Sequence, residues 1–182
     1  MTDTLVLPYA ERLLTCLCTA LAETIGGTPC QCALRPGDAP PPADVCCVCE
    51  SGQGQASVQI TEIFPVLAGK FPSRGGVAGA LNNCASYEWA AELTMVVYRC
   101  VSVADENGFP SFDELMADTR KIADDAQAMR RALLCCDWHN RPDDGETQPI
   151  VPSPWKAIQP QGGCAGGQQS VVVLLGSECC PA

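Results

Sequence analysis

The sequence is poor in the groups on which most enzyme active sites and nucleic-acid-binding surfaces depend. Its one histidine, His139, stands in a polar segment beside Trp138, so a histidine-based metal site is disfavoured and we expect a surface histidine. The 11 basic residues are outnumbered by 21 acidic ones, and a formal charge of −10 argues against binding nucleic-acid phosphates. The patterns GxSxG, HExxH, GxxxxGKS/T and GxGxxG are all absent. We therefore expect no enzymatic activity, no catalytic residue and no cofactor.

Long hydrophobic runs are also missing. No segment approaches the roughly 20 apolar residues that cross a bilayer as a helix, so we expect no membrane association. The first residues, MTDTLVLPYAERLL, contain neither a basic segment nor a small-residue cleavage site, so we expect synthesis in the cytoplasm without a secretory signal. Hydrophobic residues nevertheless make up 47% of the 182 residues, which is enough to predict one folded domain over residues 1–182.

The apolar pattern of the first half predicts a helix and then strands. Pro8 suits a first helical turn, apolar residues recur behind it at three- and four-residue spacing, and Ile25–Gly27 ends the helix. A weak strand is predicted near residues 30–34. Gln55–Phe64 alternates as a half-buried strand, with a bulge at Glu62–Ile63.

A Gly- and Pro-rich loop over residues 66–83 is predicted to join this strand to an antiparallel partner at Tyr87–Val101. One face of the partner strand is predicted to be apolar, and this face comprises Trp89, Ala91, Leu93, Met95 and Val97.

The clearest helical pattern follows Ser111, which can form a capping box with Glu114. We expect its apolar stripe to lie against the sheet face just described, and that stripe comprises Leu115, Thr119, Ile122, Ala126, Met129 and Leu133. The opposite face is expected to be solvated, and it carries Asp118, Lys121, Asp124, Asp125 and Arg131.

Two short strands are predicted at the end of the chain, near residues 150–158 and 170–175. Residues 161–168 are expected to be a mobile, exposed turn between them, and residues 176–182 a flexible tail. The predicted fold class is therefore α+β, with two main helices packed on an antiparallel or mixed sheet in the order α-β-β-β-α-β-β.

Cysteine is unusually abundant, with 14 in the chain, although stable disulfides are rare in a reducing cytoplasm. A protein that leaves the cell by lysis, inside a virus particle, would resolve this conflict. We expect Cys16 to be a buried thiol on the apolar face of the first helix. The expected disulfides join Cys30 or Cys32 to the cluster of Cys46, Cys47 and Cys49, and Cys135 or Cys136 to Cys100 or to that cluster.

Two other uses of the cysteines stay open. Cys30, Cys32, Cys46 and Cys49 could hold a structural zinc ion, although their irregular spacing favours disulfides. The Cys46–Cys49 pair is also a CxxC motif, but it leads into a strand, whereas redox CxxC motifs stand at the start of a helix.

An ordered series of motifs runs along the chain. CCVC leads to VQITEIFP, then come FPS, YRCVSV and ADENGFPSFDELMADTRKIADDAQAMRRALLCC, and QPQGGCAGGQQSVVV closes the series. The series covers residues 5–176 and resembles head–tail connector proteins of tailed bacteriophages that infect actinobacteria, most of all the tail terminator family.

The resemblance implies a structural virion protein that forms a homo-hexamer ring at the head–tail junction. This ring would cap the tail tube and contact the tail tube protein and the neighbouring head connector or stopper protein. DNA would pass through its channel without specific binding, which suits a net acidic chain. The alternatives are a head-completion or stopper protein of the neck, a cysteine-rich zinc-binding adaptor, and a thiol oxidoreductase.

Overall fold

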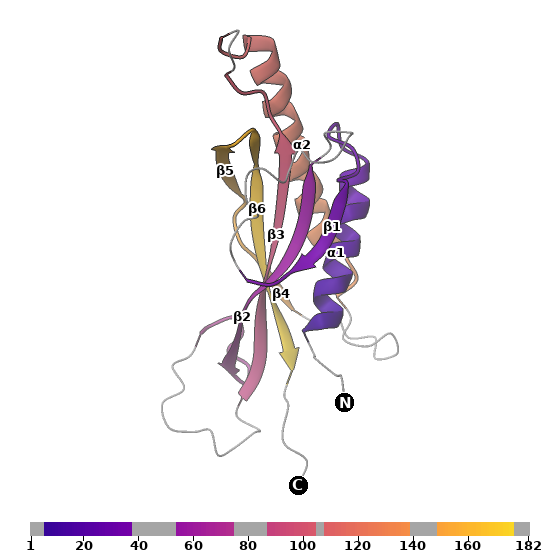
Figure 1. Ribbon diagram of the computed structural model, residues 1–182. Coiled ribbons are helices and arrows are strands. Elements are labelled where there is room, and N and C mark those ends of the chain that lie inside the picture. The colour runs from indigo at the N-terminus through magenta and orange to yellow at the C-terminus, as the bar shows by residue number, and fades with distance from the viewer. Residues whose placement is uncertain (1–5, 38–53, 75–86, 105–107, 139–148, 177–182) are drawn as a thin grey trace.

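The computed structural model describes residues 6–37, 54–74, 87–104, 108–138 and 149–176. Within these ranges the chain forms two α-helices and a six-stranded mixed sheet, so the predicted α+β class is confirmed. Both helices lie on the same face of the sheet (Figure 1). No helix in the described parts of the chain is long and apolar enough to cross a membrane.

Three long antiparallel strands form the centre of the sheet, namely β2 (Gln55–Leu67), β3 (Tyr87–Cys100) and β6 (Cys164–Gly176). The predicted pairing of the first two is confirmed, although β2 takes in the first two residues of the predicted loop 66–83. The register of β2 against β3 shifts between Ile60 and Glu62, which confirms a bulge close to its predicted place. The bulge inserts one extra residue into β2. As a result, Ile60 before the bulge and Ile63 after it both face the helices.

Three short strands complete the sheet. At one edge β1 (Gln31–Arg35) runs parallel to β2. At the other edge β4 (Ile150–Pro152) and β5 (Lys156–Gln161) both pair with β6, one after the other. The order across the sheet is therefore β1-β2-β3-β6-β4, with β5 also on β6.

The C-terminal part differs from its prediction. The strand expected at 150–158 is two strands, and the exposed turn expected at 161–168 is reduced to Gly162 and Gly163, which adopt φ values of 56° and 79°. The glycine-rich residues that follow are buried strand. Gly167 has a packing role there, because a Cβ atom at this position would overlap the ring of Trp155.

The two helices begin as the sequence predicts. In α1 (Leu7–Ala22) a proline occupies the first turn. In α2 (Phe112–Cys135) the capping box is confirmed, because the backbone N–H of Ser111 donates to Glu114 Oε2 at 2.7 Å and the N–H of Glu114 donates to Ser111 Oγ at 3.3 Å.

One main core lies between the helices and the sheet. It is built from the apolar face of α1, the second half of α2 and the helix-facing side chains of the long strands. Its largest fully buried members include Tyr9, Leu13, Leu17, Leu21, Leu93, Met95 and Met129.

Only the second half of α2 reaches this core. Met129 and Leu133 are buried there, as predicted, but Leu115 is 48% exposed and Ile122 is only partly buried. The prediction that Leu115 lies against the sheet is therefore wrong, and Ile122 does not reach the core as predicted. The first turns of α2 extend past the ends of the strands (Figure 1), and further along the helix Ile122 borders an open groove instead of the core.

Candidate functional site

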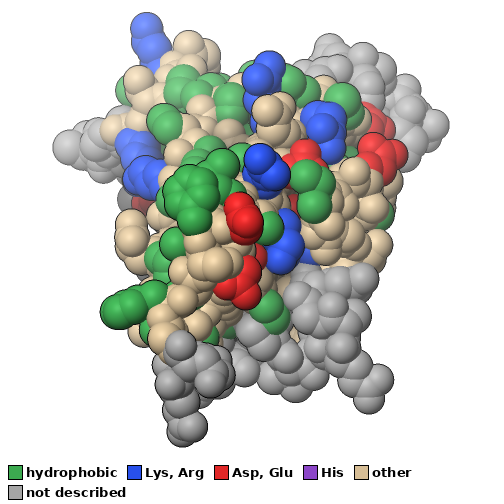
Figure 2. Space-filling model, turned by 90° about the horizontal axis from the view of Figure 1, so that it is seen from above, with side chains coloured by type: hydrophobic (Ala, Val, Ile, Leu, Met, Phe, Trp, Pro, Cys, Tyr) green, Lys and Arg blue, Asp and Glu red, His purple; other side chains and the backbone are tan. Residues whose placement is uncertain are grey.

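The end of the molecule at which α2 begins carries a group of exposed apolar side chains. Phe109 is 92% and Phe112 76% exposed, and three neighbours in the chain are open as well. Figure 2 looks down on this end and shows hydrophobic side chains among basic and acidic ones. Clustered apolar side chains on a surface mark places where a protein binds another molecule. We call these residues the tip cluster: Val103, Phe109, Phe112, Leu115 and Met116.

The tip cluster continues along α2 as a single apolar stripe. Phe112, Leu115, Thr119, Ile122 and Ala126 follow one another at spacings of three and four, which places them on one face of the helix. The same face then reaches the buried core residues of the second half. The face that packs on the sheet in the second half of α2 is thus open to the surface in the first half.

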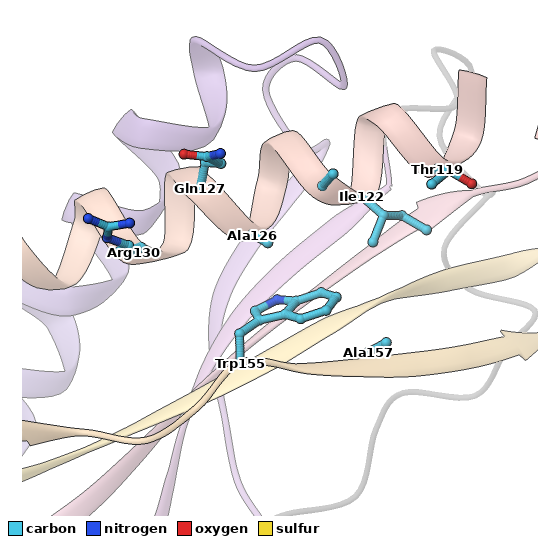
Figure 3. Close-up of a pocket in the computed structure, with 8 residues that line it drawn as sticks. Thr119, Ile122, Ala126, Gln127, Arg130, Trp155 and Ala157 are labelled. Atoms are coloured by element: carbon cyan, nitrogen blue, oxygen red, sulfur yellow. The ribbon is translucent and has the colours of Figure 1, made fainter. Parts of the chain in front are cut away.

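A groove of about 550 Å³ opens beneath this stripe (Figure 3). Ile122 and Ala126 are among the residues that line it from α2, and Trp155 and Ala157 line it from the β5 side. Figure 3 shows the Trp155 ring lying between α2 and the strands, beneath Ala126 and Ile122. Its buried Nε1 has no hydrogen-bond partner. The lining of the groove is mainly apolar, which is typical of a surface that contacts another molecule.

A buried ion pair fixes α2 where its exposed half begins. Arg99 of β3 is 1% exposed, and its Nε and Nη2 donate to the two carboxylate oxygens of Asp125 at 2.7 and 2.8 Å. The same guanidinium donates to the Gly26 carbonyl at 2.9 Å, and the Thr24 hydroxyl donates to Asp125 at 3.1 Å. The prediction that Asp125 is solvated is wrong, because Arg99 supplies a buried countercharge.

Two further carboxylates of α2 tie the helix to its surroundings. Asp118, also predicted to be solvated, is buried and accepts hydrogen bonds from the Ser102 N–H at 2.7 Å and from Lys121 Nζ at 3.1 Å. Burial alone would raise the pKa of Asp118, but these hydrogen bonds outweigh it and hold the pKa below its ordinary value of 3.8. Asp124 accepts from the Ile25 N–H at 2.8 Å. The projecting half of α2 is therefore held in a fixed direction.

Two disulfides link α1 to the end of α2 and to β1. Cys16 binds Cys136 at the end of α2, with a Cα–Cα distance of 5.7 Å, and Cys18 binds Cys32 of β1, with a distance of 6.3 Å. The prediction of Cys16 as a buried thiol is wrong, and so is the expectation that Cys136 pairs with Cys100 or with the Cys46–Cys49 cluster. Residues two apart on a helix point about 200° apart, which lets Cys16 and Cys18 reach opposite neighbours. That spacing was the signal in the sequence.

The remaining described cysteines fall into two groups. Cys30, Cys100 and Cys164 are also disulfide-bonded, whereas Cys135 carries an exposed free thiol. A disulfide sulfur is not a thiolate, so Cys30 and Cys32 cannot act as zinc ligands in this state. Within the described ranges no group of three His, Cys, Asp or Glu side chains could hold a metal ion. Four residues named in the sequence predictions lie outside those ranges: Cys46, Cys47, Cys49 and His139.

The opposite end of the molecule bears a second open apolar surface. Beyond the bulge, Ile63 pairs with Ala91 and Pro65 with Trp89, so these side chains share the helix-facing side of the sheet. Ile63 is 49% exposed, and Leu67 and Trp89 are exposed as well. Trp89 therefore lies outside the core, contrary to its prediction. We call Ile63, Pro65, Leu67 and Trp89 the hairpin face.

A smaller groove lies on the same side of the sheet, towards the start of α1. It measures about 420 Å³ and is lined in part by Leu7, Leu34, Val58 and Ile60. Because Ile60 and Ile63 face the same side of β2, this groove adjoins the hairpin face. Neither the hairpin face nor the tip cluster was predicted as a site, since both consist of ordinary apolar residues whose exposure depends on where the opposite layer ends.

No family model matches the chain, and no curated protein matches it significantly. The function is therefore inferred from the residues and their arrangement.

Proposed function

We propose that this protein is a non-enzymatic structural subunit of the head–tail junction of a tailed bacteriophage, where copies of it form a ring that caps the tail tube and joins it to the head connector. The observation that carries the proposal is the apolar stripe of α2, whose first half is exposed and yet held in place by Asp118 and Asp125. A rigid, exposed apolar surface loses little conformational entropy on binding and so suits a lasting contact with another chain.

The ordered motif series of the sequence supports this particular assembly. Net charge supports it as well, because a ring with a charge of −10 on each subunit does not hold the phosphates of DNA that passes through it. The proposed partners are other copies of this chain, the tail tube protein and the head connector or stopper protein.

The cysteines fit a protein that works in a particle. All described cysteines except Cys135 are disulfide-bonded. Disulfides persist in oxidising surroundings, which a particle meets after release from its host. The zinc-binding adaptor is less well supported, because Cys30 and Cys32 are already oxidised.

Disruption of the gene in the phage that encodes it tests the proposal. A terminator ring stops tail-tube growth, so its loss should give over-long tubes without heads in electron micrographs, and the wild-type gene supplied on a plasmid should restore normal tails. Tails of normal length beside separate filled heads would instead assign the protein to the stopper. Normal, infective particles without this protein would contradict both roles, and a map of the particle neck would locate the ring directly.

A further inference from the structure

We propose that neighbouring copies in the ring join head to tail, with the tip cluster of one copy packed on the hairpin face of the next. This inference rests on the proposed function and specifies the contact that builds the ring. It follows from how the two layers of the fold are offset, from the chemistry of the two surfaces, and from the state of the charges around them.

The helix layer and the sheet layer of the fold end at different places along the molecule. At one end α2 projects past the strands, and at the other end the β2–β3 hairpin extends away from the helices (Figure 1). The open stripe of α2 faces the side on which the sheet lies, because its continuation through Met129 and Leu133 packs on the sheet. The hairpin face looks towards the helix side, because Ile63 shares its side with Ala91 of the core. The open parts of the two layers are thus complementary.

The chemistry of the two surfaces agrees with this arrangement. In the core, Met129 and Leu133 of the stripe pack in one cluster with Leu93 and Met95 of the sheet. Leu115 and its neighbours would make the same kind of contact with the hairpin face of another copy. A single exposed apolar surface could bind many different partners. Two complementary surfaces on one chain can instead bind each other on neighbouring copies of that chain. A head-to-tail contact closes into a ring when the rotation between copies divides a full turn.

Several carboxylates near the two surfaces already have partners. Glu62 and Glu92 lie on the sheet face that points away from the helices, and Arg74 bridges both. At the tip, Glu114 is engaged in the capping box and Asp118 holds Ser102. The penalty for removing a lone charge from water, which opposes many contacts, is therefore avoided at these carboxylates.

Two single substitutions in the full-length protein test the joint. Leu115→Asp places a charge in the tip cluster and Ile63→Asp places one in the hairpin face, and both sites are exposed enough for the fold to be kept. Sedimentation velocity should show rings of the parent protein and monomers of each variant, with dissociation constants raised at least about 30-fold, as for a binding hot spot. Leu134→Asp is the matched control, since Leu134 is 68% exposed on α2 and belongs to neither surface, and it should still form rings.

Mixing the two variants gives the sharper test. The Leu115→Asp variant keeps an intact hairpin face, and the Ile63→Asp variant keeps an intact tip cluster. One copy of each can therefore form a single joint, so an equimolar mixture should form dimers and nothing larger. A mixture that stays monomeric would overturn the head-to-tail arrangement. Rings formed by either variant alone would overturn the joint and leave the proposed function standing. A parent protein that stays monomeric at all concentrations would also overturn the joint, while gene disruption judges the function separately.

Discussion

The side chains of Arg99 and Asp125 form a bidentate ion pair that is 2% and 5% exposed and joins β3 to the middle of α2. Both charges are out of water, so their desolvation is compensated only while both partners and the Gly26 carbonyl stay in place. The pair lies where α2 leaves the sheet. It therefore links the stability of the domain to the direction of the projecting tip cluster.

Replacing Arg99 of β3 should destabilise the protein more than the substitution of any exposed residue on α2. Arg99→Met leaves the Asp125 carboxylate buried without its countercharge, and we expect a loss of about 3–5 kcal/mol in the free energy of unfolding. The double variant Arg99→Met, Asp125→Leu removes both charges and should recover much of that loss. Urea denaturation of the parent, the two single variants and the double variant measures the coupling. A double variant no more stable than Arg99→Met would contradict this account.

Asp118 should make stability depend on pH in the acid range. Its pKa is below the ordinary value of 3.8 in the folded protein, so its carboxylate favours the folded state at any pH above that value. This contribution should be lost as the pH falls from 3.8 through the lower pKa of the folded state. The stability difference between the parent and Asp118→Asn should therefore be constant near neutral pH and shrink in acid. A difference that grew in acid would have the wrong sign.

Much of the fold could be predicted because its signals are local. The capping box at Ser111, the alternation of β2 and the stop of α1 near Gly26 each depend on a few neighbouring residues. The strand β6 was predicted too short because its glycines resemble a turn. Tertiary contacts show why that stretch is extended, because Gly166 lies against the backbone of β3 and Gly167 against the ring of Trp155.

The surfaces proposed for assembly were harder to predict. Periodicity gave the apolar stripe of α2 correctly, but it does not tell whether Leu115 meets the same chain or another one. The charge pattern of α2 was also misread, because Asp118 and Asp125 have partners on β3 and just beyond it, far away in the sequence. Hydrogen-bond and ion-pair partners that come from other segments leave no signal in the sequence next to the carboxylate.

Ile122 and Met129 share the stripe of α2 but should respond differently to truncation. Met129→Ala removes a fully buried side chain and should cost about 2–5 kcal/mol. Ile122→Ala empties part of an open groove, where water replaces the lost atoms, so we expect about 1 kcal/mol or less. Chemical denaturation of the isolated subunit compares the two. Equal losses would mean that Ile122 belongs to the core after all.

Gly167 should be intolerant of any side chain. A Cβ atom there would overlap the Trp155 ring, so Gly167→Ala should push the indole away from β6 at a cost of about 1–3 kcal/mol. The fluorescence of Trp155 should shift to longer wavelength as the ring becomes hydrated, and a Trp155→Phe background assigns the change. Gln168→Ala, on the neighbouring residue, should leave both stability and fluorescence nearly as they are.

The disulfide between Cys16 and Cys136 should contribute more stability than the one between Cys18 and Cys32. The two bonds span 120 and 14 residues of sequence, and a longer loop loses more entropy in the unfolded chain when it is closed. Loop-closure entropy gives about 5 kcal/mol for the first bond and about 3 kcal/mol for the second. The paired variants Cys16→Ser, Cys136→Ser and Cys18→Ser, Cys32→Ser, unfolded under oxidising conditions, measure the two contributions separately.

Mass spectrometry of non-reduced peptides provides the control for these variants. In the parent protein it should find Cys16 linked to Cys136 and Cys18 to Cys32, while Cys135 alone among the described cysteines should react with iodoacetamide without unfolding. If the variants unfolded like the parent under oxidising conditions while the peptides showed both bonds, chain entropy would not explain the stability of this fold. If the peptides showed other pairings, the contact between α1 and the end of α2 would have to be redrawn.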